Sequence, residues 1–271
     1  MTEVQQVLSQ AQRIEHHHPW GRVIWHVWGA HQNKPPLVLL HGGSGSWTHW
    51  VRNVLHLSRT REVWALDIPG FGDSDLPAGV RDADQLPPYL ESIFQLAFAD
   101  QAVDVIGFSF GGMTAGLTAA AYPQRFRQLM LVAPAGLGLF GPRLALRATT
   151  ADMNDSQRRE VHRYNLSLMM LHDVGLIRDE VVDLQIQNVA RDRLRRRRIA
   201  ATDVLVGVQH QWQCPVHGIW GENDALYRGT LPQVNEVLTR LDSFQLIADA
   251  GHWVMYENAQ AFHHLVDSWL V

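Results

Sequence analysis

Several features that would narrow the function are scarce in this 271-residue sequence. Its single cysteine, Cys214, permits no disulfide within the chain, which is compatible with a reducing compartment such as the cytoplasm. No apolar run approaches the roughly 20 residues that cross a bilayer. The first twenty residues also have no apolar segment of the kind found in signal peptides. We therefore expect a soluble cytoplasmic protein with no membrane partner.

An excess of one charge is missing as well. Lys and Arg number 23 against 27 Asp and Glu, which gives a net charge of −4 and no broad basic surface for nucleic acid. The exception is residues 191–198, a run that contains six arginines. We interpret this run as a solvated helix face. The alternative is that one of its arginines reaches under a cap and holds a substrate carboxylate through a bidentate contact.

Three consecutive histidines occupy residues 16–18. They have no accompanying carboxylate or cysteine spacing that would complete a closed metal site. We therefore expect no metal ion and no cofactor. As partner we expect a small-molecule substrate, and a homodimer is left open.

Apolar runs rich in Val, Ile and Leu alternate with helical patterns, which predicts a mostly parallel α/β sheet covered by helices on both faces. Residues 136–212 contain no good strand and most of the arginines, so we expect them to form a helical cap inserted into a core domain of residues 1–135 and 213–271. Strands are expected at residues 22–28, 36–40, 62–66, 102–106, 128–132, 216–220 and 243–247, and helices at 48–57, 88–98, 110–122, 231–241 and 259–270.

The most informative motif is Gly-x-Ser-x-Gly, formed by Gly107, Ser109 and Gly111. It lies between an apolar strand-like run and a helix of small residues, which is the context of a nucleophile elbow. A serine on such a sharp turn has strained backbone angles, so its neighbours two residues away need almost no side chain. Ser109 is therefore the candidate nucleophile.

A serine hydroxyl needs a base to take its proton, and the base needs a carboxylate to orient it. Among 15 histidines, His252 follows the last predicted strand directly, at the sheet edge where the serine lies. Asp224 lies on the loop after the preceding strand, with Glu222 and Asp249 as competitors. The chain order Ser109, Asp224, His252 is the order expected for this architecture.

An oxyanion hole requires two backbone donors. Phe110 follows the nucleophile and Gly43 follows the first parallel strand, so their amides are the candidates. Aromatic and glycine residues beside the catalytic loops are expected to line an apolar substrate pocket. The predicted substrate-binding residues are Gly42, Trp47, Phe108 and Trp253, whereas Met169 and Met170 are interpreted as helix core with ligand contact as the alternative.

Together these motifs resemble the α/β-hydrolase family. The resemblance extends from about residue 18 to 271 and includes residues 41–43, 67–74, 107–111, 221–224 and 251–252. It implies a sheet of about eight strands, a helical cap and a Ser-His-Asp triad. Within the family, Trp253 after His252 resembles the carbon–carbon bond hydrolases of aromatic degradation.

Two departures weaken that narrower assignment. The turn at residues 42–47 lacks the proline of those enzymes. Their cap arginine lies in a helix before an Asn-rich stretch, whereas the comparable place here is residues 185–188, and Arg191 and Arg193 come a turn or two later. We therefore favour a serine hydrolase of a small, fairly apolar ester or lactone that works through an acyl-enzyme. The alternatives are carbon–carbon hydrolysis of a 2-hydroxy-6-oxo-dienoate, acyl transfer or perhydrolysis by the same serine, and a non-catalytic small-ligand receptor.

Overall fold

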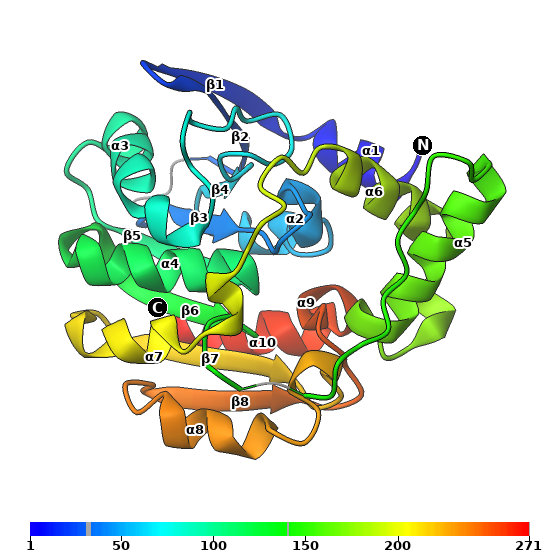
Figure 1. Ribbon diagram of the computed structural model, residues 1–271. Helices are drawn as coiled ribbons and strands as arrows, with labels where there is room; N and C mark the ends of the chain where they lie inside the picture. The colour runs from blue at the N-terminus through cyan, green and yellow to red at the C-terminus, as the bar shows by residue number, and fades with distance from the viewer. Residues whose placement is uncertain (31–33, 140, 271) are drawn as a thin grey trace.

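An eight-stranded sheet forms the centre of the protein in the computed structural model, which describes residues 1–30, 34–139 and 141–270 (Figure 1). The strand order is β1-β2-β4-β3-β5-β6-β7-β8. The β1–β2 and β2–β4 pairs are antiparallel and the remaining pairs are parallel, so the predicted mostly parallel α/β sheet is confirmed. The strands are β1 (Gln12–His18), β2 (Gly21–Trp28), β3 (Leu37–Leu40), β4 (Val63–Leu66), β5 (Val103–Phe108), β6 (Phe126–Val132), β7 (Val216–Gly221) and β8 (Ser243–Ile247).

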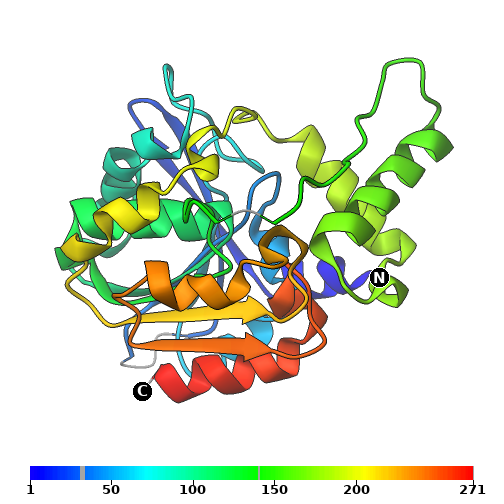
Figure 2. The same ribbon diagram turned by 60° about the horizontal axis from the view of Figure 1, so that its bottom comes forward.

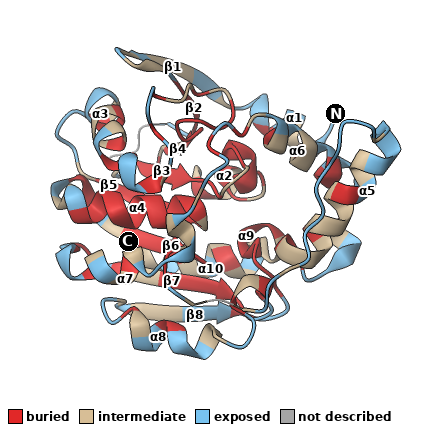
Figure 3. Cartoon of the chain, in the orientation of Figure 1, coloured by how far each residue is buried: buried red, intermediate tan, exposed pale blue. Residues whose placement is uncertain are grey.

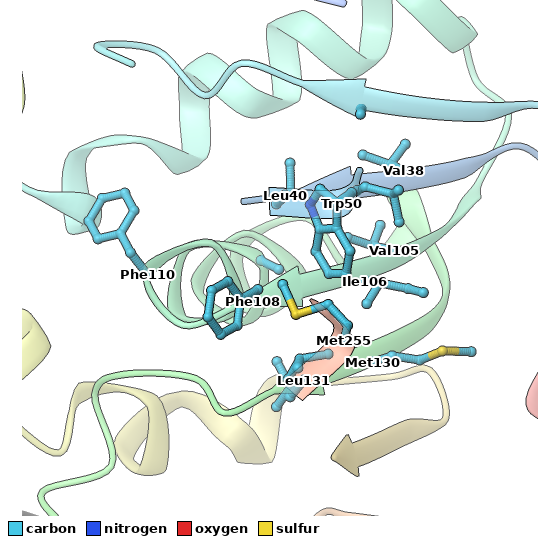
Figure 4. Packing of buried hydrophobic residues seen from close by; sticks show 14 of the residues in the cluster. Val38, Leu40, Trp50, Val105, Ile106, Phe108, Phe110, Met130, Leu131 and Met255 are labelled. Atoms are coloured by element: carbon cyan, nitrogen blue, oxygen red, sulfur yellow. The ribbon is translucent and has the colours of Figure 1, made fainter. Parts of the chain in front are cut away.

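The central strands are apolar on both faces because helices cover both faces. Every residue of β3 and of β5 is buried, and Figure 3 shows the burial concentrated in these strands and in α4 (Phe110–Ala121). Asp104 is the one charged residue in β5, and its carboxylate accepts a hydrogen bond from buried Arg61 at 2.6 Å. The side chains of these strands pack with Trp50 and Met255 in the hydrophobic core (Figure 4).

Helices lie on both faces of the sheet. α4 packs on β5 and β6 and is flanked by α3 (Pro87–Phe98) and α7 (Val204–Val208), while α10 (Ala259–Trp269) lies on the opposite face (Figure 2). In the part of the chain that the structure describes, no helix is both long and apolar enough to cross a membrane. The remaining α-helices are α1 (Glu3–Leu8), α2 (Val54–Leu57), α5 (Asp155–Asn165), α6 (Asp179–Ala190), α8 (Val234–Val237) and α9 (Val254–Glu257).

Two predicted helices are shorter than the sequence pattern suggests, because tertiary hydrogen bonds replace bonds within the helix. Residues 48–57 form a 3₁₀ turn (Trp47–Trp50) and then α2, with the Asn53 side chain at the break donating to the Met255 carbonyl at 2.9 Å. Residues 231–241 form a short turn and α8, and the Arg240 amide beyond α8 donates to Gln209 Oε1 at 3.1 Å.

The long segment between β6 and β7 leaves the sheet at its carboxyl edge. It contains α5, α6 and α7, and its described residues form no strand. Figures 1 and 2 show α5 and α6 beyond the arrowheads of β7 and β8, away from the layers of the sheet. α7, by contrast, packs against α4, and the inserted cap of residues 136–212 stays a prediction.

Candidate active site

Ser109 occupies the sharp turn between β5 and α4, with φ 52° and ψ −114°. Positive φ is costly for a residue other than glycine and persists only where the surrounding structure enforces it. A Cβ on Gly107 would lie 2.6 Å from the Gly111 carbonyl oxygen, and a Cβ on Gly111 would lie 2.4 Å from the carbonyl oxygens of Leu40 and His41. Glycine is therefore required on both sides of Ser109 by backbone contacts.

The structure brings Ser109, His252 and Asp224 into one hydrogen-bonded chain. His252 Nε2 lies 3.0 Å from Ser109 Oγ, and His252 Nδ1 lies 2.7 Å from Asp224 Oδ2. His252 and Asp224 are 3% and 2% exposed, so water hardly weakens their interaction. With the Nδ1 proton donated to Asp224, the Nε2 lone pair faces the serine hydroxyl, which is the arrangement of a general base.

Asp224 is selected over its two competitors by position. It follows the end of β7, and its Oδ1 accepts a hydrogen bond from the Leu226 amide at 2.9 Å, which fixes the carboxylate beside the imidazole. Glu222 and Asp249 are both exposed and are not bonded to His252.

Gly43 and Phe110, whose amides are the predicted oxyanion donors, line the same cavity as Ser109. Phe110 is the first residue of α4, so its amide has no partner within the helix. The Gly42 amide donates to His49 Nδ1 at 3.2 Å, and Gly43 is the next residue, at the wall of the cavity described below. Aimed at one point, the Phe110 and Gly43 amides would stabilise a developing oxyanion.

A buried histidine holds the loop that carries Gly43. His41 Nε2 accepts a hydrogen bond from the Ile68 amide at 3.0 Å, which leaves Nδ1 to donate to the Gly42 carbonyl at 2.8 Å. Burial lowers the pKa of His41 to about 4. The ring therefore stays neutral at physiological pH and keeps both bonds.

A cavity of about 470 Å³ opens at Ser109, and its size is typical of small-molecule sites. Gly42 and Phe108 line it as predicted, and both Met169 and Met170 line it as well. Residues 166–170 form a π-helical turn, a local distortion that is frequent at functional sites. Further lining residues that the sequence analysis did not identify include Ser44, Leu139, Leu146, Gln185, Leu226 and Tyr227. Arg197 lines the cavity as well, so one arginine of residues 191–198 does reach it, as the alternative interpretation of that run expected.

Trp47 and Trp253 do not line this cavity, contrary to the prediction. The Trp253 indole N–H donates to the His49 carbonyl at 2.9 Å, and its ring stacks on Tyr256 at 4.2 Å. Trp47 packs against Trp28, with ring centroids 5.2 Å apart. Both tryptophans therefore pack against neighbouring aromatic side chains. The sequence pattern does not indicate toward which side of a loop these side chains point.

The arginine-rich residues 191–198 do not form the predicted helix face. α6 ends at Ala190, and the chain continues as an irregular segment, here called the arginine strap. Its backbone is tied to the core: the Arg193 amide donates to the Gly70 carbonyl at 2.9 Å, and Leu194 is 2% exposed. Arg191 pairs with Asp73 at 3.1 Å, whereas Arg197 reaches the cavity. These long-range contacts outweigh helix propensity.

Within the described residues, no group of three or more His, Cys, Asp or Glu side chains is arranged to hold a metal ion. The histidines at residues 16–18 lie on β1, at the edge of the sheet.

The family assignment follows from comparison with known sequences. A family model described as "Alpha/beta hydrolase family" matches residues 37–265. The chain belongs to this family. The predicted resemblance is thus confirmed, and this α/β-hydrolase carries the Ser109, His252 and Asp224 arrangement on the family's sheet.

Two curated proteins with different named activities are similar to this chain. The human 1-acylglycerol-3-phosphate O-acyltransferase ABHD5 is 36% identical over 121 residues, which is 43% of this chain and 35% of that protein. The match therefore spans only about a third of that relative. The 2-hydroxy-6-oxo-2,4-heptadienoate hydrolase of Pseudomonas putida strain F1 is 28% identical over 255 residues, covering 87% of this chain and 88% of that protein.

A solved structure has the same fold over nearly the whole chain. The carboxylesterase CesB from Bacillus subtilis superposes with a TM-score of 0.74 at 18% identity, covering 99% of this chain and 95% of that one. At this identity, the likeness concerns the fold alone.

Proposed function

We propose that this α/β-hydrolase cleaves a small, fairly apolar carboxylic ester or lactone through an acyl-enzyme on Ser109. The observation that carries the proposal is the hydrogen-bonded chain from Ser109 Oγ through His252 to Asp224, at 3.0 and 2.7 Å, at the mouth of a mostly apolar cavity.

The reaction has two halves. His252 Nε2 takes the Ser109 proton as Oγ attacks the ester carbonyl, while the Gly43 and Phe110 amides stabilise the oxyanion. Asp224 stabilises the imidazolium, which then gives its proton to the leaving alcohol. In the second half, His252 takes a proton from water, the resulting hydroxide attacks the acyl carbonyl, and Ser109 recovers its proton as the acid leaves.

The proposal is tested by kcat/KM for p-nitrophenyl butyrate with the wild type and Ser109→Ala. We expect a loss of about 10⁴-fold or more, because a triad without its nucleophile retains only binding and oxyanion stabilisation. The melting temperature should hardly change. Ser268→Ala is the matched control, since Ser268 is exposed on α10, and it should keep full activity. Retained activity in Ser109→Ala would overturn the proposal.

Carbon–carbon bond hydrolysis is the second candidate. It is favoured by Trp253 directly after His252 and by similarity along most of the chain to the Pseudomonas putida dienoate hydrolase. Loss of the visible absorbance of a 2-hydroxy-6-oxo-dienoate, measured beside the ester, separates the two. A strong preference for the dienoate would replace the ester proposal. Tight ligand binding without turnover of either compound would favour a receptor.

A further inference from the structure

The loop that carries His252 lies beyond the last strand of the sheet. β8 is an edge strand, so the chain that leaves it has a neighbouring strand on one side only. Toward that neighbour, the Asn223 amide after β7 donates to the Ala250 carbonyl at 2.9 Å. The backbone groups of the loop that find no partner there need acceptors and donors from elsewhere in the fold.

The segment between β6 and β7 supplies these partners. The Trp253 amide donates to the Met170 carbonyl at 2.8 Å. Gly251 lies so close to the same segment that a Cβ on it would be 2.8 Å from the His172 amide nitrogen. Met170 lines the cavity at the end of the π-helical turn. Both chain neighbours of the catalytic histidine therefore contact backbone that continues into the cavity wall.

One side chain joins the two segments, the carboxylate of Glu257 at the end of α9. Its Oε2 accepts a hydrogen bond from the Gly251 amide at 2.7 Å, and its Oε1 accepts one from the Asp173 amide. Hydrogen bonds from backbone amides to a carboxylate are roughly twice as strong as neutral ones. Glu257 thus ties the residue before His252 to the segment that carries Met170.

The position of His252 is critical for the proposed reaction. Its Nε2 has to stay near Ser109 Oγ, which lies 3.0 Å away. A displacement of about 1 Å in a catalytic group can cost about 10²-fold in rate. Because Gly251 directly precedes His252, a shift of the Gly251 amide moves the imidazole relative to the serine.

We propose that Glu257 is a positioning residue for His252. It fastens the loop before the general base to the segment that ends in the cavity wall, which keeps the imidazole within reach of Ser109 Oγ. Glu257 is not one of the described residues that line the cavity, so it acts through the loop and does not touch the substrate. This inference rests on the proposed ester hydrolysis and adds a residue to its machinery.

The experiment measures kcat for p-nitrophenyl butyrate per active serine in the wild type, Glu257→Ala and Glu257→Gln. Active serines are counted by prolonged labelling with a fluorophosphonate and intact-protein mass spectrometry, so misfolded protein does not enter the value. In Glu257→Ala, kcat per site should fall about 10- to 100-fold, because both amides lose their acceptor and the base is displaced. Glu257→Gln keeps one acceptor oxygen and should lose less.

A merely structural role of Glu257 would give a different result. It would lower the melting temperature and the number of labelled serines, and it would leave kcat per site at the wild-type value. That outcome would overturn the proposal. Glu236→Gln is the matched control, because Glu236 is exposed on α8 and makes the same change of charge. It should keep the wild-type kcat; a loss equal to that of Glu257→Gln would also overturn the proposal.

Asp173 tests the bridge from its other end. Asp173→Pro removes the amide hydrogen that Glu257 accepts, and the φ of −80° at this residue is compatible with proline. Asp173→Ala keeps the amide and removes only the carboxylate, which accepts from the Gly175 amide at 2.8 Å. We expect kcat per site to fall about tenfold in the proline variant and much less in the alanine variant. Equal losses would assign the effect to the Asp173 side chain and overturn the bridge.

The two proposals fail in different ways. Ser109-dependent cleavage that is unchanged per site in Glu257→Ala overturns the role of Glu257 and leaves ester hydrolysis intact. Absence of cleavage by the wild type, with Ser109→Ala indistinguishable from it, overturns both. If Glu257→Ala does not fold, Glu257→Gln and the two Asp173 variants still decide the question.

Discussion

At the scale of single residues, Gly43 combines a proposed catalytic role with a steric requirement. Its amide is a proposed oxyanion donor, and its missing side chain leaves the space that Arg197 Nη1 occupies. The obstructing atom is the end of a flexible side chain, so Gly43→Ala should fold while moving Arg197 away. We expect a fall in kcat for p-nitrophenyl butyrate, because a shift of this loop displaces the proposed oxyanion donor. Wild-type kinetics on this ester would contradict the proposed role of Gly43.

Asp224 acts on the reaction only through His252, to which it is bonded at 2.7 Å. Asp224→Asn would present an amide that favours the wrong imidazole tautomer, so kcat should drop by about 10⁴-fold. The loss should shrink as the pH is raised, because hydroxide can replace the base. An Asn variant with nearly full activity at neutral pH would mean that another carboxylate orients His252.

At the scale of elements, the turn from β5 into α4 depends on glycine. Gly111→Ala would place a Cβ 2.4 Å from two backbone oxygens at the end of β3, where no side chain can move aside. We expect a loss of about 2 kcal/mol or more in the free energy of unfolding, measured by urea denaturation. Gly207→Ala is the control, since a Cβ on that α7 glycine meets nothing within 4 Å. It should be neutral or slightly stabilising; equal losses would refute the steric account.

The sequence could predict those features that depend on residues close together in the chain. Strands, the turn at Ser109 and the order of Ser109, Asp224 and His252 are local signals, because each residue follows the end of a strand. The arginine strap could not be predicted, because backbone contacts such as that between Arg193 and Gly70 join residues far apart in the chain. The direction of the Trp253 side chain could not be predicted either. Its place directly after His252 follows from the sequence, but packing against the rest of the fold decides where the indole points.

At the scale of the whole molecule, burial of histidines makes stability depend on pH. Desolvation lowers the pKa of His26, His41 and His263 to about 4, and it lowers that of His49 well below its ordinary value. A lowered histidine pKa gives stability that is complete above about 6.5 and is lost as the pH falls towards 4. Asp67 opposes this trend, because burial raises its pKa to about 6 and its protonation therefore favours the fold at acid pH.

His26→Phe tests this balance. His26 is 4% exposed, and a phenyl ring keeps its packing against Trp47 while removing the titration. Between pH 6.5 and 4, the slope of unfolding free energy against pH should fall by up to about 1.4 kcal/mol per unit. His17→Phe changes a side chain that is 78% exposed and should leave the slope unchanged. An unchanged slope in His26→Phe would show that His26 titrates normally.

The central claim concerns chemistry at one atom, Ser109 Oγ. The most direct measurement is rapid acid quenching during turnover of p-nitrophenyl butyrate, followed by mass spectrometry of the peptide that contains Ser109. The account predicts a butyryl group on Ser109, formed within the pre-steady-state burst of p-nitrophenol and absent from Ser109→Ala. Turnover of the ester with Ser109 never acylated, or turnover that survives in Ser109→Ala, would contradict it.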